Sequence, residues 1–127
     1  MTLLSKLQHP AIIKLYDLFR DKNYYYVVME YCKGGSILKM FKNMKVKSEK
    51  VIINIMKQLF SALSYLHSLN IIHRDIKLDN MVFLENADEI SDENFTIKII
   101  DFGTAVQCKQ KITKHYPIAG TLSYLAP

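Results

Sequence analysis

Asp75, Lys77 and Asn80 lie close together in the sequence, and Asp101 follows them at the head of an Asp-Phe-Gly tripeptide. An aspartate can accept a hydroxyl proton, and a lysine can neutralise the charge on a phosphate. Amide and carboxylate oxygens are ligands that Mg²⁺ prefers. We assign proton acceptance to Asp75, the phosphate to Lys77, and Mg²⁺ to Asn80 and Asp101. These residue types together predict the transfer of a phosphoryl group to an alcohol.

Each of these residues also has an ordinary structural explanation when it is considered alone. A histidine such as His73 more often belongs to a core than to a catalytic site, and Arg74 could lie on any surface. An Asp-Phe-Gly tripeptide also suits a simple turn. The run His-Arg-Asp-Ile-Lys-Leu-Asp-Asn, the tripeptide, and a third run from Gly120 to Pro127 nevertheless follow one another in this order. Their combination carries the chemical interpretation.

The apolar pattern predicts the elements that position these residues. Residues 1–8 have leucines at helical spacing, and the His9-Pro10 pair is expected to end that helix. Residues 12–19 and 24–31 are rich in β-branched and aromatic side chains and predict two paired strands. Ser48 is the predicted N-cap of a long apolar helix that ends near Asn70. Further strands are expected at residues 71–72, 81–84 and 96–100.

An acidic segment separates the last two predicted strands. Five acidic residues lie between Glu85 and Glu93. We interpret residues 85–95 as a solvated surface loop. A calcium-binding loop is the alternative, but the segment lacks the glycine and the terminal glutamate spacing of an EF-hand.

The composition limits the class of protein. Half of the 127 residues are apolar, which is enough for one domain with a core. The net charge of +5 comes from scattered lysines without an arginine-rich stripe, which argues against nucleic-acid binding. No apolar run approaches the roughly 20 residues of a membrane span, and the N-terminal residues are unlike a signal peptide. The two cysteines lack metal-ligand spacing, which favours reduced thiols and an intracellular protein, cytoplasmic or nuclear.

The three motifs resemble those of the protein kinase family, and the resemblance covers essentially the whole chain. It implies an α+β fold with a partial small lobe, made of the end of the αC helix and two strands, and an incomplete, mainly helical large lobe. Residues 1–30 would belong to the small lobe, residues 31–36 to the hinge, and residues 37–127 to the large lobe through the activation segment. Lys77 after Arg74-Asp75, and Thr121 after Gly120, resemble the pattern of the serine/threonine class. The hinge residues resemble calcium/calmodulin-dependent and protist calcium-dependent kinases.

The resemblance also implies a binding site for ATP. Met29 would be the gatekeeper, the backbones of Glu30 and Cys32 would meet the adenine, and Val82 would form its floor. Ordinary core packing is compatible with these roles for Met29 and Val82. A stacked apolar spine is implied as well, and its members would be Leu4, Leu15, His73 and Phe102.

The activation segment is implied to involve Arg74, Thr113 and Thr121. The hydroxyl of Thr121 is expected to form hydrogen bonds near Asp75 and Lys77. Arg74 normally meets a phosphate, but the usual phosphoacceptor position holds Pro117. Thr113 and Tyr116 are the candidates nearby, and an unmodified lysine-rich loop is the alternative.

The sequence departs from the family pattern in several places. Ser36 replaces an acidic residue that would meet the ribose or a basic substrate side chain, which puts a preference for basic substrates in doubt. The chain contains no glycine-rich phosphate loop, no Val-Ala-x-Lys strand and no αC glutamate, and it stops before the glutamate expected after Pro127. We therefore expect the intact parent kinase to phosphorylate Ser or Thr of protein substrates with ATP and Mg²⁺, and the isolated chain to be almost inactive. The parent could also carry a regulatory domain outside this chain.

Two other functions stay open on the sequence alone. A truncated kinase-like chain could be a non-catalytic binding module that engages a partner through its exposed helix. The chain could also be a fragment without an independent function.

Overall fold

The computed structural model describes residues 3–43, 48–86, 89–91, 94–108 and 118–125. Its strands form three small sheets. β1 (Leu15–Arg20) pairs with β2 (Tyr25–Met29), and β4 (Ile71–Ile72) pairs with β7 (Val106–Gln107). The third sheet has the order β3 (Gly35–Ser36), β5 (Met81–Phe83), β6 (Ile97–Ile99). The helices are α1 (Ile37–Asn43) and α2 (Glu49–Ser68), with short 3-10 helices at Leu3–Lys6, Leu78–Asn80 and Leu122–Tyr124.

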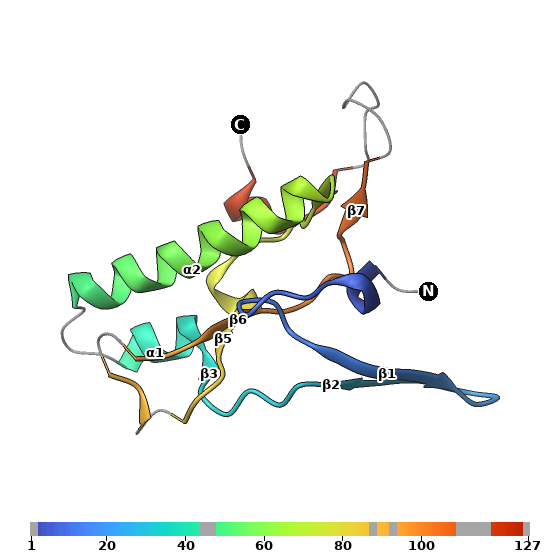
Figure 1. The fold of residues 1–127 in the computed structure, drawn as a ribbon, viewed down its shortest axis with the longest axis horizontal. Coiled ribbons are helices and arrows are strands. Elements are labelled where there is room, and N and C mark those ends of the chain that lie inside the picture. The colour runs from blue at the N-terminus through green and yellow to red at the C-terminus, as the bar shows by residue number, and fades with distance from the viewer. Residues whose placement is uncertain (1–2, 44–47, 87–88, 92–93, 109–117, 126–127) are drawn as a thin grey trace.

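The long helix α2 forms because apolar side chains recur at intervals of three and four residues. Ser48 occupies its N-cap position in an extended conformation, as predicted, but the Ser48 side chain makes no capping hydrogen bond. The helix packs over β4 and β6 and runs along one side of the molecule (Figure 1). Its end is marked by Asn70, which has a φ of 57°. The buried stripe consists of Val51, Ile55, Leu59, Ala62 and Leu66.

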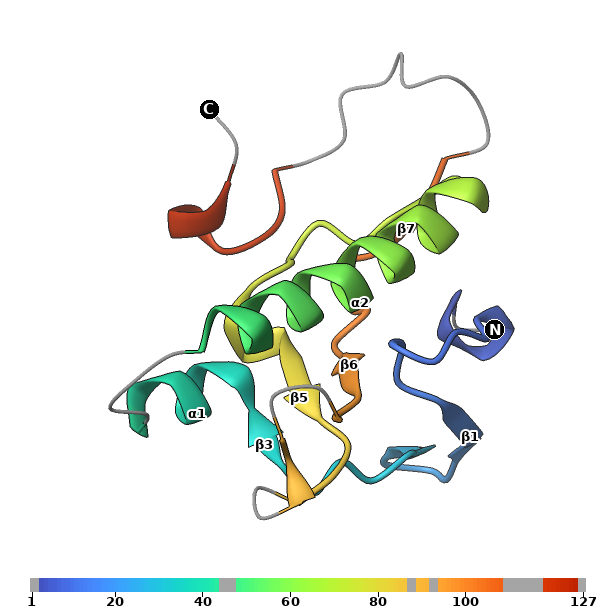
Figure 2. The same cartoon turned by 60° about the vertical axis from the view of Figure 1, so that its left-hand side comes forward.

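The core lies between α2 and the sheet of β3, β5 and β6. Figure 2 shows α2 on one side of this sheet. Side chains from α1, α2, β5 and β6 meet there because each of these elements turns one apolar face inward. The largest fully buried side chains are Ile37, Leu66, Phe83, Ile97 and Ile99.

The β1–β2 hairpin projects from the side opposite α2 (Figure 1). Its turn is organised by Asp21, whose Oδ1 accepts hydrogen bonds from the backbone nitrogens of Asn23 and Tyr24 at 2.7 Å each. All residues of β2 are exposed. Backbone hydrogen bonds join the hairpin to the rest of the chain, because Ile99 donates to the Ala11 carbonyl at 2.9 Å and accepts from Ile13 at 3.0 Å.

The structure differs from the sequence-based expectations in detail. Within the described residues, the predicted N-terminal helix is the 3-10 helix Leu3–Lys6. The predicted strands exist, and β4 has the bounds that were predicted, whereas the others are shorter than expected or shifted at their ends. The pairing of β7 with β4 was not predicted, since two residues carry too little periodicity to be recognised. Among the described residues, no helix is both long and apolar enough to cross a membrane.

Candidate active site

The catalytic candidates lie on the loop that follows β4 and ends in the 3-10 helix Leu78–Asn80. Arg74 has a φ of 70°, which is unusual for a residue with a side chain. Two hydrogen bonds to the segment after Asp101 hold this turn. Arg74 Nε donates to the Thr104 carbonyl at 2.6 Å, and Thr104 Oγ1 donates to the His73 carbonyl at 3.0 Å. The unusual backbone therefore turns Asp75 toward the site with support from a distant part of the chain.

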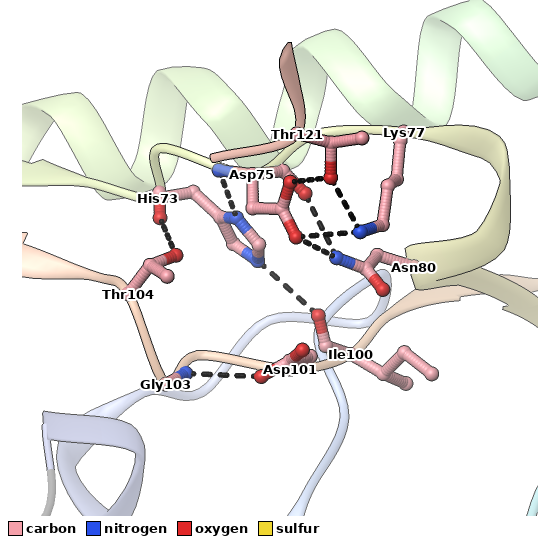
Figure 3. A network of polar contacts seen from close by, with 9 residues as sticks. All are labelled: His73, Asp75, Lys77, Asn80, Ile100, Asp101, Gly103, Thr104 and Thr121. Atoms are coloured by element: carbon pink, nitrogen blue, oxygen red, sulfur yellow. Dashed lines mark hydrogen bonds and ion pairs between the residues drawn. The ribbon is translucent and has the colours of Figure 1, made fainter. Parts of the chain in front are cut away.

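Asp75 is the centre of a network of side chains (Figure 3). Its Oδ2 lies 2.9 Å from Lys77 Nζ and accepts a hydrogen bond of 2.9 Å from Asn80 Nδ2. Its Oδ1 accepts a hydrogen bond of 2.7 Å from Thr121 Oγ1, and that hydroxyl accepts one of 2.7 Å from Lys77 Nζ. Asn80 Nδ2 also donates to the Asp75 carbonyl at 2.9 Å. Three side chains from two distant segments, those of Lys77, Asn80 and Thr121, thus fix one carboxylate.

These contacts set the charge of Asp75. The hydrogen bonds from Lys77, then from Thr121, lower the pKa of Asp75 from 3.8 to about 2, although partial burial opposes them. The same bond to Asp75 raises the pKa of Lys77. The Asp75 side chain keeps 10% of its surface exposed. The site therefore presents an ionised carboxylate and a protonated amine side by side at neutral pH.

Asn80 and Asp101, the two predicted metal ligands, lie on adjoining segments. The Ile100 nitrogen donates to the Asn80 carbonyl at 2.9 Å, which places Asp101 next to the end of the catalytic loop. Because the Asn80 amide nitrogen is bonded to Asp75, its oxygen faces away from that carboxylate (Figure 3). Asp101 is exposed, has a φ of 60°, and its Oδ1 accepts a hydrogen bond from the Gly103 nitrogen at 3.2 Å. This pair of oxygen donors fits a hard cation such as Mg²⁺.

The His73 ring connects the catalytic loop to the residue before Asp101 through two hydrogen bonds. Its Nε2 donates to the Ile100 carbonyl at 3.2 Å and its Nδ1 accepts from the Asp75 nitrogen at 3.3 Å. Burial lowers the pKa of His73, which keeps the ring neutral and suits these two roles. Its ring meets the edge of Phe102 at a centroid distance of 4.7 Å. Of the other spine candidates, Leu4 is half-buried against the core, as is Phe102, and Leu15 is half-buried at the start of β1.

The candidates for ATP binding lie on two elements. Met29 ends β2 with much of its side chain exposed, and Glu30 and Cys32 follow it. Val82 lies in the middle of β5, half-buried, opposite Ser36 in β3 and Lys98 in β6. Burial raises the pKa of the Cys32 thiol, so it is protonated at neutral pH.

The activation-segment candidates have different outcomes. Arg74 lies in the catalytic loop and donates a hydrogen bond to the Thr104 carbonyl, and Thr121 binds Asp75 of the same loop. Thr113 and Tyr116 lie outside the described residues. Gly120 has a φ of 117°, and a Cβ atom on it would collide with the Arg74 carbonyl. This close approach brings Thr121 within reach of Asp75.

Sequence reasoning missed three contributions to the site. Thr104 binds the backbone of the catalytic loop, although nothing in the sequence marks it apart from its position after Asp-Phe-Gly. Ser36 Oγ accepts a hydrogen bond from the Lys39 nitrogen at 3.3 Å, as an N-cap does, and a serine before an apolar run is a recognisable cap signal. Lys98 forms an ion pair with Glu30, and a charged residue within an apolar strand could have indicated it.

Comparison with known proteins agrees with this geometry. The model of the protein kinase domain family matches residues 1–127 of this chain. Calcium-dependent protein kinase 6 of Plasmodium berghei is 39% identical over 127 residues, which is 100% of this chain and 8% of that protein. Serine/threonine-protein kinase PLK4 of Xenopus tropicalis is 41% identical over 123 residues, which is 96% of this chain and 12% of that protein.

These relatives include a calcium-dependent kinase, the class that the hinge residues resemble. The predicted resemblance to serine/threonine protein kinases is confirmed. The chain spans only a small part of the length of either relative. With its catalytic-loop geometry and a match over its whole length, this chain belongs to the protein kinase family.

Proposed function

We propose that the intact protein containing this chain transfers the γ-phosphoryl group of ATP to a Ser or Thr hydroxyl of a protein substrate, with Mg²⁺. The network around Asp75 carries the proposal, because it joins a carboxylate, a lysine and an amide at hydrogen-bond distance. Phosphoryl transfer depends mainly on positioning and on neutralising charge, and these groups can do both.

Asp75 orients the acceptor hydroxyl. With a pKa of about 2 it is ionised at neutral pH and accepts a hydrogen bond from the incoming alcohol. As the alcohol oxygen bonds to the γ-phosphorus, the bond from that phosphorus to the bridging oxygen breaks and ADP leaves, while the alcohol proton passes to the carboxylate. Thr121, already bonded to Oδ1, keeps the carboxylate from rotating out of line.

Lys77 stabilises the charge on the transferred group. Its ammonium lies 2.9 Å from Asp75 Oδ2 and 2.7 Å from Thr121 Oγ1, beside the carboxylate that would receive the acceptor hydroxyl. Asn80 and Asp101 would hold Mg²⁺ through their side-chain oxygens, with phosphate oxygens and water as further ligands. When bound, Mg²⁺ neutralises the phosphate charge that the protein must otherwise balance.

The nucleotide would lie between the hinge and β5. Glu30 and Cys32 would offer backbone groups to the adenine, and Val82 would pack against the ring. By this assignment residues 1–30 belong to the small lobe, residues 31–36 form the hinge, and residues 37–127 belong to the large lobe. Lys77 and Thr121 support Ser/Thr rather than Tyr as the acceptor, because both follow the serine/threonine pattern.

Phosphorylation by the intact protein tests the proposal. Transfer of labelled phosphate from ATP to a Ser/Thr acceptor protein should require Mg²⁺ and should disappear with Asp75→Asn. A variant of an exposed lysine far from the site, Lys57→Met, should keep full activity. Phosphorylation of tyrosine alone, or activity that survives Asp75→Asn, would refute the proposed reaction.

The exposed apolar side chains of α2 favour a second function, a non-catalytic binding module. Phe60 is 60% exposed, and Ile52, Ile53 and Met56 are also exposed. Such side chains on one helix fit a partner surface, whether from the same protein or another. Stoichiometric binding of a partner that is unchanged by Asp101→Ala and lost with Phe60→Asp, without any phosphorylation, would favour this function.

A further inference from the structure

A largely buried ion pair joins Glu30, the residue before the proposed hinge, to β6, the strand that precedes Asp101. Lys98 Nζ lies 2.9 Å from Glu30 Oε2, and the two side chains are 9% and 17% exposed. The same Glu30 oxygen accepts a hydrogen bond of 3.3 Å from the Lys14 nitrogen. The Glu30 nitrogen in turn donates to the Lys14 carbonyl at 2.9 Å. One carboxylate therefore connects the ends of β1 and β2 with the middle of β6.

The strand neighbours of Lys98 show on which face of the sheet its side chain lies. Its strand neighbours Ile97 and Ile99 are fully buried in the core, so Lys98 points to the other face. Lys98 and Val82 are partners across β5 and β6, and directly opposite residues share one face. Lys98 thus lies on the same face as the residue proposed to support the adenine.

The pair costs free energy to bury, which points to a role beyond stability. Removing two charges from water is expensive, and apolar residues of similar size often serve as well or better for stability. Lys98 lies in β6, three positions before Asp101 in the sequence, while Glu30 is the first residue after β2. This contact therefore links the segment that leads into the hinge with the strand that leads to Asp101.

We propose that the Glu30–Lys98 ion pair is a positioning pair for the nucleotide, which holds the start of the hinge, directly after Glu30, in register with β6, the strand that leads to Asp101. The inference rests on the proposed function, because it takes the hinge as the adenine site. Neither side chain touches the reacting atoms. The pair therefore acts on nucleotide affinity, with little effect on the rate of transfer once ATP is bound.

Equilibrium binding of a fluorescent ATP analogue with Mg²⁺ to the intact protein tests the pair. The variants are Glu30→Gln, Lys98→Met and the double variant, with Lys57→Met as the control for loss of a lysine. Because the pair acts as a unit, each single variant and the double variant should all lose about tenfold in nucleotide affinity. If the two residues acted independently, their losses would multiply, and the double variant would lose about a hundredfold. The rate at saturating ATP should stay within about threefold of wild type, since only binding is affected.

Thermal denaturation separates positioning from stability. Each single variant leaves one buried charge without its partner and should melt earlier, whereas the double variant should recover the wild-type melting temperature. If the single variants do not fold, the nucleotide affinity of the double variant alone tests the role of the pair. Weak nucleotide binding by a stable double variant supports the pair, and wild-type affinity refutes it. Wild-type affinity in both folded single variants, or a multiplied loss in the double variant, also refutes it.

The outcome is independent of the reaction itself. A wild-type protein that binds the nucleotide without phosphorylating any acceptor would contradict the proposed function, and the binding cycle would still decide the role of the pair. A wild-type protein that binds no nucleotide would contradict both.

Discussion

The Thr121 hydroxyl donates a hydrogen bond of 2.7 Å to Asp75 Oδ1 across 46 positions of the sequence. Lys77 Nζ lies within hydrogen-bond distance of both residues. The segment around Gly120 thus completes the arrangement that begins in the catalytic loop. This relationship explains why the three sequence motifs occur together, because each supplies a part that the others lack.

Replacing Thr121 by valine should reduce turnover. Valine keeps the shape of threonine but loses the hydroxyl, so Asp75 loses one of the two hydrogen bonds that most lower its pKa. We expect kcat to fall by about tenfold or more while the KM for ATP changes little, because the loss is one of orientation. Steady-state kinetics of the intact protein measure both constants. Thr121→Ser should retain most activity, and equal losses in the two variants would contradict the role of the hydroxyl.

The low pKa of Asp75 predicts a stability change in acid. The group is ionised in the folded protein down to about pH 2, whereas in the unfolded chain it takes up a proton near its ordinary pKa of 3.8. Its stabilising contribution is therefore fully present above pH 4 and is lost as the pH falls toward 2. Urea unfolding of the wild type and of Asp75→Asn across this range measures the effect.

The comparison of the two proteins is essential because Asp75 is not the only carboxyl group with a lowered pKa. The backbone hydrogen bond from Asn23, then the hydroxyl of Tyr26 and the backbone of Tyr24, lower the pKa of Asp21 as well. The free energy of unfolding should change with pH more steeply in the wild type than in Asp75→Asn, and only this difference reports on Asp75. The same pH dependence in the two proteins would show that the Asp75 carboxylate is not held as the structure describes.

Gly120→Ala should impair activity more than Gly35→Ala. Both glycines have a positive φ, so both alanine variants carry backbone strain of about 1 kcal/mol. A Cβ at Gly35 meets no atom within 4 Å, whereas one at Gly120 would meet the Arg74 carbonyl and push Thr121 away from Asp75. Circular dichroism should therefore show a larger loss of stability for Gly120→Ala than for Gly35→Ala, and phosphorylation assays should show a large loss of activity only for Gly120→Ala. Equal activities would contradict the close approach.

Truncation of α2 side chains should separate core from surface. Leu66 is fully buried, and Leu66→Ala should cost about 2–5 kcal/mol of unfolding free energy through the cavity it leaves. Phe60 is 60% exposed, and Phe60→Ala should cost less than about 1 kcal/mol. Chemical denaturation measures both values. A Phe60→Ala variant as unstable as Leu66→Ala would place that ring in a packed core.

The elements with strong periodicity could be predicted from the sequence. The long helix begins after Ser48 and ends near Asn70 as expected, because its buried stripe follows the period of an α-helix. The β1–β2 hairpin was also predicted, since its side chains favour strands and Asp21 organises the turn. The boundaries shifted by a few residues because strand ends depend on partners that the local sequence does not specify.

Contacts between distant segments could not be predicted from local patterns. The β4–β7 pairing, the Thr104 bond to His73 and the Glu30–Lys98 ion pair each depend on how segments far apart meet. The contact between Thr121 and the catalytic loop was expected only from the family resemblance. Side-chain chemistry thus indicated what the site can do, and the fold determined which groups take part together.

Phosphoryl transfer by the intact protein tests the central claim most directly. Labelled ATP, Mg²⁺ and a Ser/Thr acceptor should give labelled phosphoserine or phosphothreonine, and Asp75→Asn should abolish the label while nucleotide binding persists. Full transfer by a folded Asp75→Asn variant would contradict the role of this carboxylate, and with it the proposed mechanism.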